Sequence, residues 1–134
     1  MNGKRIVDIS EYRLRVNSES FFRILDKCVS ATSSRGKRAY ATMIAIGPED
    51  EHFCWFHYRA GRNNVDCIVE PAIPSSRLRE VKELLSQAGI KWKDLHRSRS
   101  DSRTIDIHLN AEQVSQKEVW GQVEKVLRIS AASA

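Results

Sequence analysis

Apolar residues recur along the chain first at helical and then at strand spacing, and this pattern predicts eight elements. Their order over residues 17–129 is α-β-β-β-α-β-β-α, with short turns between the strands. This order favours an α+β fold, a twisted and mainly antiparallel sheet of about five strands with helices packed on one side. We expect a single domain over residues 17–129 and fraying over residues 130–134. The pattern of residues 1–16 fits a strand, a helix or a packed arm.

Five segments rich in β-branched and aromatic residues predict the strands. Pro71 and Pro74 are expected to end the third strand, because proline cannot donate a hydrogen bond to a neighbouring strand. A basic loop is expected between the last two strands. The predicted strands cover residues 39–46, 52–59, 65–70, 92–96 and 104–109.

Three segments carry apolar residues three and four positions apart and have recognisable helix ends. Asn17 or Ser18 can cap the first helix. Gly89 is placed to close the second helix in a left-handed conformation. Asn110, with Gln113 three residues later, predicts a capping box at the start of the last helix.

The two central strands are apolar on both faces, whereas a sheet covered on one side usually shows a polar second face. Alternation places Phe53, Trp55 and His57 on one face, with Met43 of the preceding strand beside them. Fully burying one Phe or Met side chain is worth roughly 1.5–3 kcal/mol, so a patch of this kind left in water is costly. Either the chain covers this face itself, or a protein partner or a second copy covers it. We assign these four residues to a candidate partner-binding face.

The net charge of +5 is unevenly distributed, and basic side chains gather in residues 35–38 and 96–103. The alternatives are two solvated loops or a contact surface for an anionic partner, either nucleic acid or an acidic protein. No RNP-type, KH or helix-turn-helix signature is present. The candidate anion-binding residues are Arg35, Lys37, Arg38, Arg97, Arg99 and Arg103.

A carboxylate–imidazole group is a further candidate site. Asp66 and Glu70 share one face of the third strand, and Asp106 and His108 share one face of the fifth. If these strands are neighbours, the group could support acid–base or metal-assisted hydrolysis. The carboxylate–x–Lys pair of many nucleases is absent, since Pro71 and Ala72 follow Glu70.

No metal or cofactor is expected. Strand alternation sends His57 to the opposite face from His52 and Cys54, so these three residues do not converge as zinc ligands. The GxSxG, P-loop, GxGxxG and HExxH patterns are all absent.

The cysteines indicate a reducing compartment. Cys28, Cys54 and Cys67 are an odd number without CxxC spacing, which predicts reduced and mostly buried thiols in a cytoplasmic protein. No apolar run approaches the roughly 20 residues that span a bilayer, and Asp8 and Glu11 interrupt the start of the chain where a signal peptide would be apolar. We expect no membrane partner.

These patterns favour a non-enzymatic binding protein of the chaperone, inhibitor or adaptor type. Its apolar sheet face would bind a protein partner or a second copy, and its basic loops would contact an acidic surface. The alternative is an accessory protein that binds or processes nucleic acid through the arginine-rich loops. A hydrolase that uses the Asp/Glu/His group is the third hypothesis.

Overall fold

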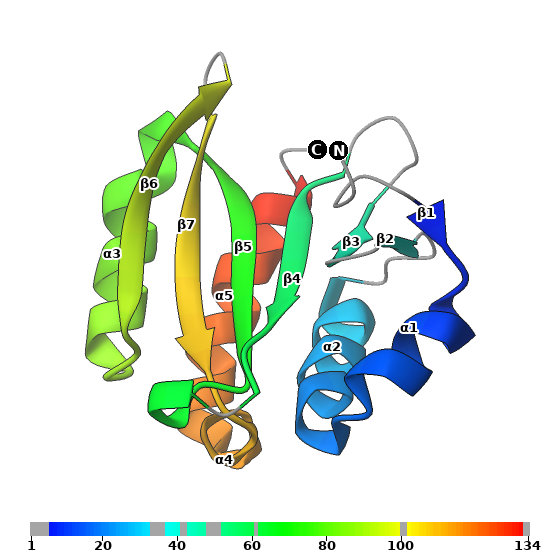
Figure 1. Cartoon of the computed structure of the whole chain (residues 1–134). Helices are drawn as coiled ribbons and strands as arrows, with labels where there is room; N and C mark the ends of the chain where they lie inside the picture. Colours follow the sequence, from blue (N-terminus) through cyan, green and yellow to red (C-terminus); the bar gives the residue numbers. More distant parts are fainter. Residues whose placement is uncertain are drawn as a thin grey trace.

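The computed structural model of the chain describes residues 6–32, 37–40, 43–47, 52–60, 62–99 and 102–132, without the side chains of 95–99 and 102–103. It shows one seven-stranded antiparallel sheet with helices packed on one side (Figure 1). The predicted α+β class is therefore confirmed. The sheet has two more strands than the five that the sequence predicts.

Neighbouring strands follow the order β1-β2-β3-β4-β5-β7-β6 across the sheet. Strand β6 forms one edge, and β7 lies between it and β5. The strands are β1 (Ile6–Val7), β2 (Lys37–Tyr40), β3 (Ile44–Ile46), β4 (Cys54–Tyr58), β5 (Cys67–Pro74), β6 (Trp92–Arg99) and β7 (Ser102–Leu109).

The helices pack against the sheet and against one another. Helix α5 contacts β5 and also α2, α3 and α4, and α3 and α5 lie behind the strands in Figure 1. Two short 3-10 turns, Arg62–Asn64 and Ser75–Arg77, flank β5. The helices are α1 (Ile9–Val16), α2 (Glu19–Thr32), α3 (Leu78–Gln87), α4 (Ala111–Ser115) and α5 (Lys117–Ala132).

The amino-terminal segment that fitted both a strand and a helix contains one of each. Residues 6–7 pair with β2 at the sheet edge, and residues 9–16 form α1. The Asp8 side chain caps this helix by accepting a hydrogen bond of 2.8 Å from the Ser10 backbone N–H. Tyr12 is 1% exposed and packs edge-on against Phe22, so α1 belongs to the core.

The predicted strand over residues 39–46 is wrong, because the chain forms two strands there. Strands β2 and β3 pair antiparallel, with Ala39 opposite Ile44 and Lys37 opposite Ile46. The chain therefore reverses within a segment that is apolar almost throughout, so the pattern gave no sign of a turn.

The prediction that Pro71 ends the third strand is also wrong. Strand β5 continues to Pro74. Its pairing with β7 has partners at Val69 and Ala72 but skips Glu70 and Pro71. A proline is tolerated at a position where the pairing with the neighbouring strand does not need its missing N–H. Strand β5 therefore continues beyond Pro71.

The basic segment 96–103 is largely the end of a hairpin and not a loop. Strand β6 runs to Arg99 and β7 begins at Ser102, with an irregularity in their pairing between Leu95 and Ser98. Polar and basic residues dominate this segment, so its composition concealed the strands.

Two of the helix ends that the sequence predicts are confirmed. Gly89 has a φ of 70°, and Ile90 behind it is buried. The capping box is confirmed, since Gln113 N–H donates to Asn110 Oδ1 at 2.8 Å and Asn110 N–H donates to Gln113 Oε1 at 2.9 Å. The last predicted helix is divided at Gln116 into α4 and α5.

The expected fraying from residue 130 is wrong for residues 130–132, which continue α5. Ser130 is 1% exposed, and its hydroxyl lies 2.8 Å from the carbonyl oxygen of Ala72 and 3.0 Å from that of Phe53. The Ser130 hydroxyl therefore connects the end of α5 to Ala72 of β5 and to Phe53, the residue before β4.

The core lies between the sheet and the helices. Cys28, Cys54 and Cys67 are free and buried within it, as their apolar surroundings predicted, and burial raises the pKa of all three thiols. Among the described residues, no helix has both the length and the apolar character needed to cross a bilayer.

Candidate docking face of the sheet

The sheet face that points away from α2, α3 and α5 carries the candidate site, and we call it the open face. Strand pairing lines up one side chain from each of six strands there. The pairs Val69–Ile107 and Ala72–Thr104 keep one register, which places Glu70 opposite Asp106. We call this line the central row: Arg38, Ala45, Trp55, Glu70, Asp106 and Lys93.

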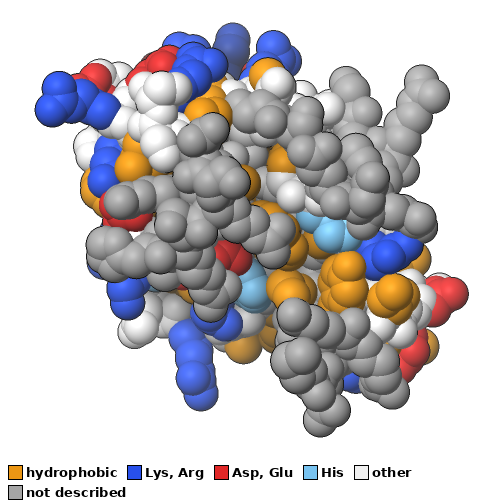
Figure 2. All heavy atoms as spheres, turned by 90° about the horizontal axis from the view of Figure 1, so that it is seen from above, with side chains coloured by type: hydrophobic (Ala, Val, Ile, Leu, Met, Phe, Trp, Pro, Cys, Tyr) orange, Lys and Arg blue, Asp and Glu red, His pale blue; other side chains and the backbone are white. Residues whose placement is uncertain are grey.

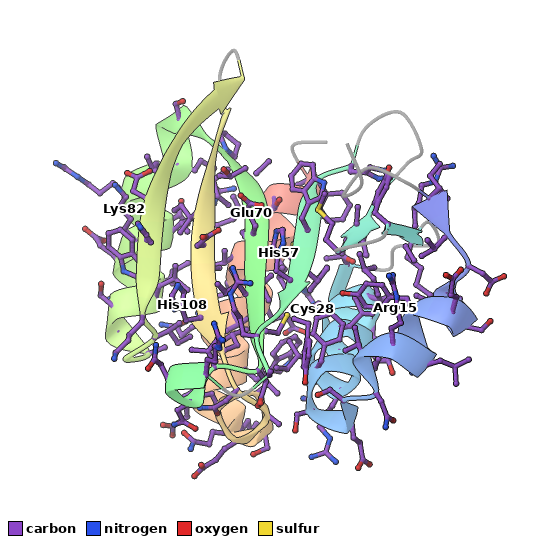
Figure 3. All side chains as sticks on the ribbon, in the orientation of Figure 1. Arg15, Cys28, His57, Glu70, Lys82 and His108 are labelled. Carbon is purple, nitrogen blue, oxygen red and sulfur yellow. The ribbon has the colours of Figure 1, made fainter. Side chains whose placement is uncertain are left out.

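Glu70 is the most deeply placed charged residue of the central row. It is 5% exposed, although no described helix covers this face. The Nε2 atom of His57 lies 3.2 Å from its Oε2, and the two side chains lie side by side on β4 and β5 in Figure 3. His57 stands opposite Ile68, so the bond runs diagonally between the strands. The buried carboxylate therefore has a hydrogen-bond partner, as burial of charge requires.

Asp106 faces Glu70 from the next strand. Burial and the Glu70 carboxylate raise the pKa of Asp106, while His57, His108 and Arg59 oppose that rise. His108 lies on the same strand and face, two residues from Asp106 and opposite Ile68. The open face thus brings two carboxylates and two imidazoles together at its centre.

Asp66 does not belong to this group, although the sequence placed it on the face of Glu70. Its Oδ2 atom accepts a hydrogen bond of 2.9 Å from the backbone N–H of Ala111. Asp66 lies just before β5, where strand alternation no longer fixes direction, and it stabilises the start of α4.

The four residues predicted for partner binding divide into three groups. Met43 and Trp55 are partly exposed. Phe53 is 7% exposed and packs in the core, so it does not belong to a docking surface. Phe53 lies just before β4, and its carbonyl oxygen accepts a hydrogen bond from Ala72 N–H. The alternation of side chains between the two faces of β4 therefore does not extend to Phe53. The side chain of His57 is 27% exposed and binds Glu70.

The open face mixes side chains of different character. Figure 2, which looks down on the end of the sheet from above, shows histidine side chains next to hydrophobic ones and, at one point, next to an acidic one. Trp55 and Ile68 supply apolar surface within and beside the central row. Cationic side chains, Arg38 and Lys93, stand at the two ends of the row.

The predicted anion-binding residues do not gather at one place in the sheet. Lys37 is exposed and Arg38 partly exposed on β2. Three strands separate β2 from β7, which begins at the basic hairpin. Arg35 lies outside the described residues, as do the side chains of Arg97, Arg99 and Arg103.

No protein-family model matches this chain, and no curated protein or solved structure is significantly similar to it.

Two hollows of the described surface lie on the helical side. One, of about 860 Å³, is formed by α1, α2 and α5 and holds Trp120, with Lys27 Nζ 4.7 Å from the ring centre. Another, of about 460 Å³, lies along α3. Neither includes a residue of the central row. Among the described residues, no three His, Cys, Asp or Glu side chains converge as metal ligands.

This arrangement offers a broad surface with specific charges. Neither of these two hollows contains His57, Glu70 or Asp106. Trp55 is of a residue type that is enriched in protein interfaces, whereas the lysine, glutamate and aspartate of the central row are of types that are depleted there.

The sequence singled out Trp55, and it grouped Glu70, Asp106 and His108 on the condition that their strands are neighbours, but it did not predict the His57–Glu70 pair. The His57–Glu70 contact depends on the pairing of β4 with β5, and the Glu70–Asp106 contact on the pairing of β5 with β7. The first pairing follows from a short turn. The second joins strands that α3 and β6 separate in the sequence, and no local signal reports it.

Proposed function

We propose that this chain is a non-enzymatic binding protein that docks a protein partner on the open face of its sheet. One observation carries the proposal: the described helices pack on the other face, while Trp55 stays partly exposed in a row that also holds four charged residues. Exposed apolar surface rimmed by polar groups is typical of protein interaction sites.

The charges of the central row support a protein partner more than nucleic acid. Glu70 and Asp106 occupy the middle of the row, where they would repel phosphate groups. Arg38 and Lys93 are held apart at its ends. A protein surface can supply both acidic and basic side chains to match this order, whereas a nucleic acid backbone is uniformly negative.

Site-specific photo-crosslinking tests the proposal in cells that produce the protein. A photoreactive phenylalanine analogue replaces Trp55 on the open face, and in a matched chain it replaces Arg79, which is exposed on α3. We expect a discrete protein adduct from position 55, either with a second copy or with another protein, and none of that mass from position 79.

Two outcomes would count against a docking role. Equal adducts from both positions would show non-specific contact, and no adduct from position 55 would leave the open face without a protein partner. The ratio of absorbance at 260 and 280 nm tests the alternative. Nucleic acid that co-purifies with the chain and is removed by salt would favour the arginine-rich hairpin as the site.

A further inference from the structure

We infer that the partner on the open face is a second copy of this chain, related by a twofold axis that runs parallel to the strands through Trp55. This inference rests on the proposed function and names its occupant. It follows from one pair of opposite charges in the central row, Arg38 and Asp106, which exchange places when the row is reversed about Trp55.

The spacing of the strands determines which residues of the two copies face each other. Arg38 on β2 lies two strands from Trp55 on one side, and Asp106 on β7 lies two strands away on the other. Adjacent strands are about 4.8 Å apart, so the two distances along the row are equal. Rotation about the axis places Arg38 of each chain over Asp106 of the other. Because a twofold interface is isologous, this contact forms twice.

The same geometry excludes the other simple twofold arrangement. An axis parallel to the row would place every residue against its own copy, so that Arg38 would face Arg38 and Asp106 would face Asp106. Like charges brought together across an interface oppose association. The order of charges therefore selects the axis that runs along the strands.

The centre of this interface pairs the two Trp55 side chains. Tryptophan is among the residue types most enriched at the energetically dominant positions of protein interfaces. Ala45 is fully buried and Glu70 is 5% exposed, so neither residue adds a contact to this interface, and the His57–Glu70 pair stays in place. Burial and the charge of Glu70 disfavour the ionised form of Asp106. The positive charge of Arg38 from the second copy would stabilise that form.

Charge reversal tests this pairing by light scattering of the full chain over a wide range of concentration. The wild type should scatter at twice the 15.3 kDa mass of one chain. Arg38→Glu alone sets a carboxylate against Asp106, and Asp106→Arg alone sets a guanidinium against Arg38, each twice per dimer. Each single variant should raise the dimer dissociation constant roughly tenfold or more.

Mixing the two variants restores both contacts. In the mixed dimer, the glutamate introduced at position 38 of one chain meets the arginine introduced at position 106 of the other. The unchanged Arg38 and the unchanged Asp106 meet at the second contact. An equimolar mixture of R38E and D106R should therefore dimerise when neither variant does so alone, and a chain that carries both changes should also dimerise. Arg79→Glu on α3 is the matched control and should leave the dimer unchanged.

Several results would overturn the inference. They are a wild-type chain that stays at 15.3 kDa, single variants that dimerise like the wild type, or a mixture that stays monomeric. Circular dichroism checks that each variant is folded. If a reversed charge unfolds the chain, Arg38→Gln and Asp106→Asn replace it, and each should weaken the dimer by roughly threefold. A monomeric wild type that still gives an adduct with another protein from position 55 would refute the dimer and retain the proposed function.

Discussion

The Nε2 atom of His57 lies 3.2 Å from Oε2 of Glu70, which is 5% exposed on a sheet face that no described helix covers. Glu70 therefore keeps a hydrogen bond inside the sheet and is held in one position. A fixed carboxylate beside Trp55 gives the open face a defined charge pattern, which a flexible surface glutamate would not.

Loss of the imidazole should cost stability. His57→Ala removes one partner of a buried carboxylate, and we expect the free energy of unfolding to fall by about 1–3 kcal/mol at neutral pH. Urea denaturation at a fixed protein concentration measures the change. His108→Ala is the control, because it removes an imidazole from the same face at a position opposite Ile68 and leaves the His57–Glu70 bond in place. Equal losses from both variants would show that the His57–Glu70 bond contributes nothing specific.

Asp106 should make stability depend on pH in a direction that its pKa fixes. Its folded pKa is raised above 3.8, mainly by burial and then by Glu70. The folded chain therefore favours the protonated form of Asp106. The stability that this form contributes is fully present below the pKa of Asp106 in the unfolded chain, and it is lost as pH rises through the pKa of Asp106 in the folded chain. We expect Asp106→Asn to be more stable than the wild type at neutral pH, with little difference near pH 3.8.

This comparison uses urea denaturation at a concentration at which light scattering finds single chains. Glu83→Gln, an exposed change on α3, is the control and should show no such pH dependence. A difference between Asp106→Asn and the wild type that is constant over this range would contradict the raised pKa.

Ser130 should contribute to stability through the hydrogen bonds of one hydroxyl. It has a single proton for the carbonyl oxygens of Phe53 and Ala72, at 3.0 and 2.8 Å. Ser130→Ala leaves both acceptors buried with one donor fewer, and we expect a loss of about 1–3 kcal/mol in the free energy of unfolding. Ser76→Ala, on an exposed turn, should change stability by less than about 0.5 kcal/mol. A neutral Ser130→Ala would mean that packing alone holds the end of α5.

The same substitution at two glycines should act in opposite directions. A Cβ at Gly121 or at Gly89 would meet no heavy atom within 4 Å, so neither change creates a clash. Gly121 lies inside α5, and Gly121→Ala should stabilise the chain by about 1 kcal/mol. Gly89 has a φ of 70°, and Gly89→Ala should destabilise it by about 1 kcal/mol. Thermal unfolding measures both, and shifts of equal sign would contradict the assigned helix ends.

Local signals in the sequence predicted the parts of the fold that depend on neighbouring residues. The capping box of Asn110 and Gln113 and the left-handed Gly89 involve contacts within a few positions, and both are confirmed. The α+β class also follows from the order of periodic segments. The turn between β2 and β3 was missed, because alternating apolar residues continue across it.

The candidate site could be predicted only in part, because its contacts cross the sheet. Alternation correctly placed Trp55 and His57 on one face of β4. It failed at Phe53 and Asp66, which lie just outside their strands and bond to other parts of the chain. Glu70 lies opposite Asp106 because β7, and not β6, is the neighbour of β5 in the sheet. This strand order depends on long-range packing.

Hydroxyl-radical footprinting of the three tryptophans tests the docking role of the open face most directly. It compares oxidation in intact cells with oxidation of the dilute purified chain. Trp55 lies on the open face, and Trp120 lines the hollow formed by α1, α2 and α5. Trp92 packs near α3, where its indole N–H lies 3.4 Å from Ser86 Oγ. If the open face is occupied in cells, Trp55 should be protected there, while Trp120 and Trp92 stay as reactive as in the dilute chain. Protection of Trp120 with unchanged oxidation of Trp55 would contradict the account and place the interface on the helices.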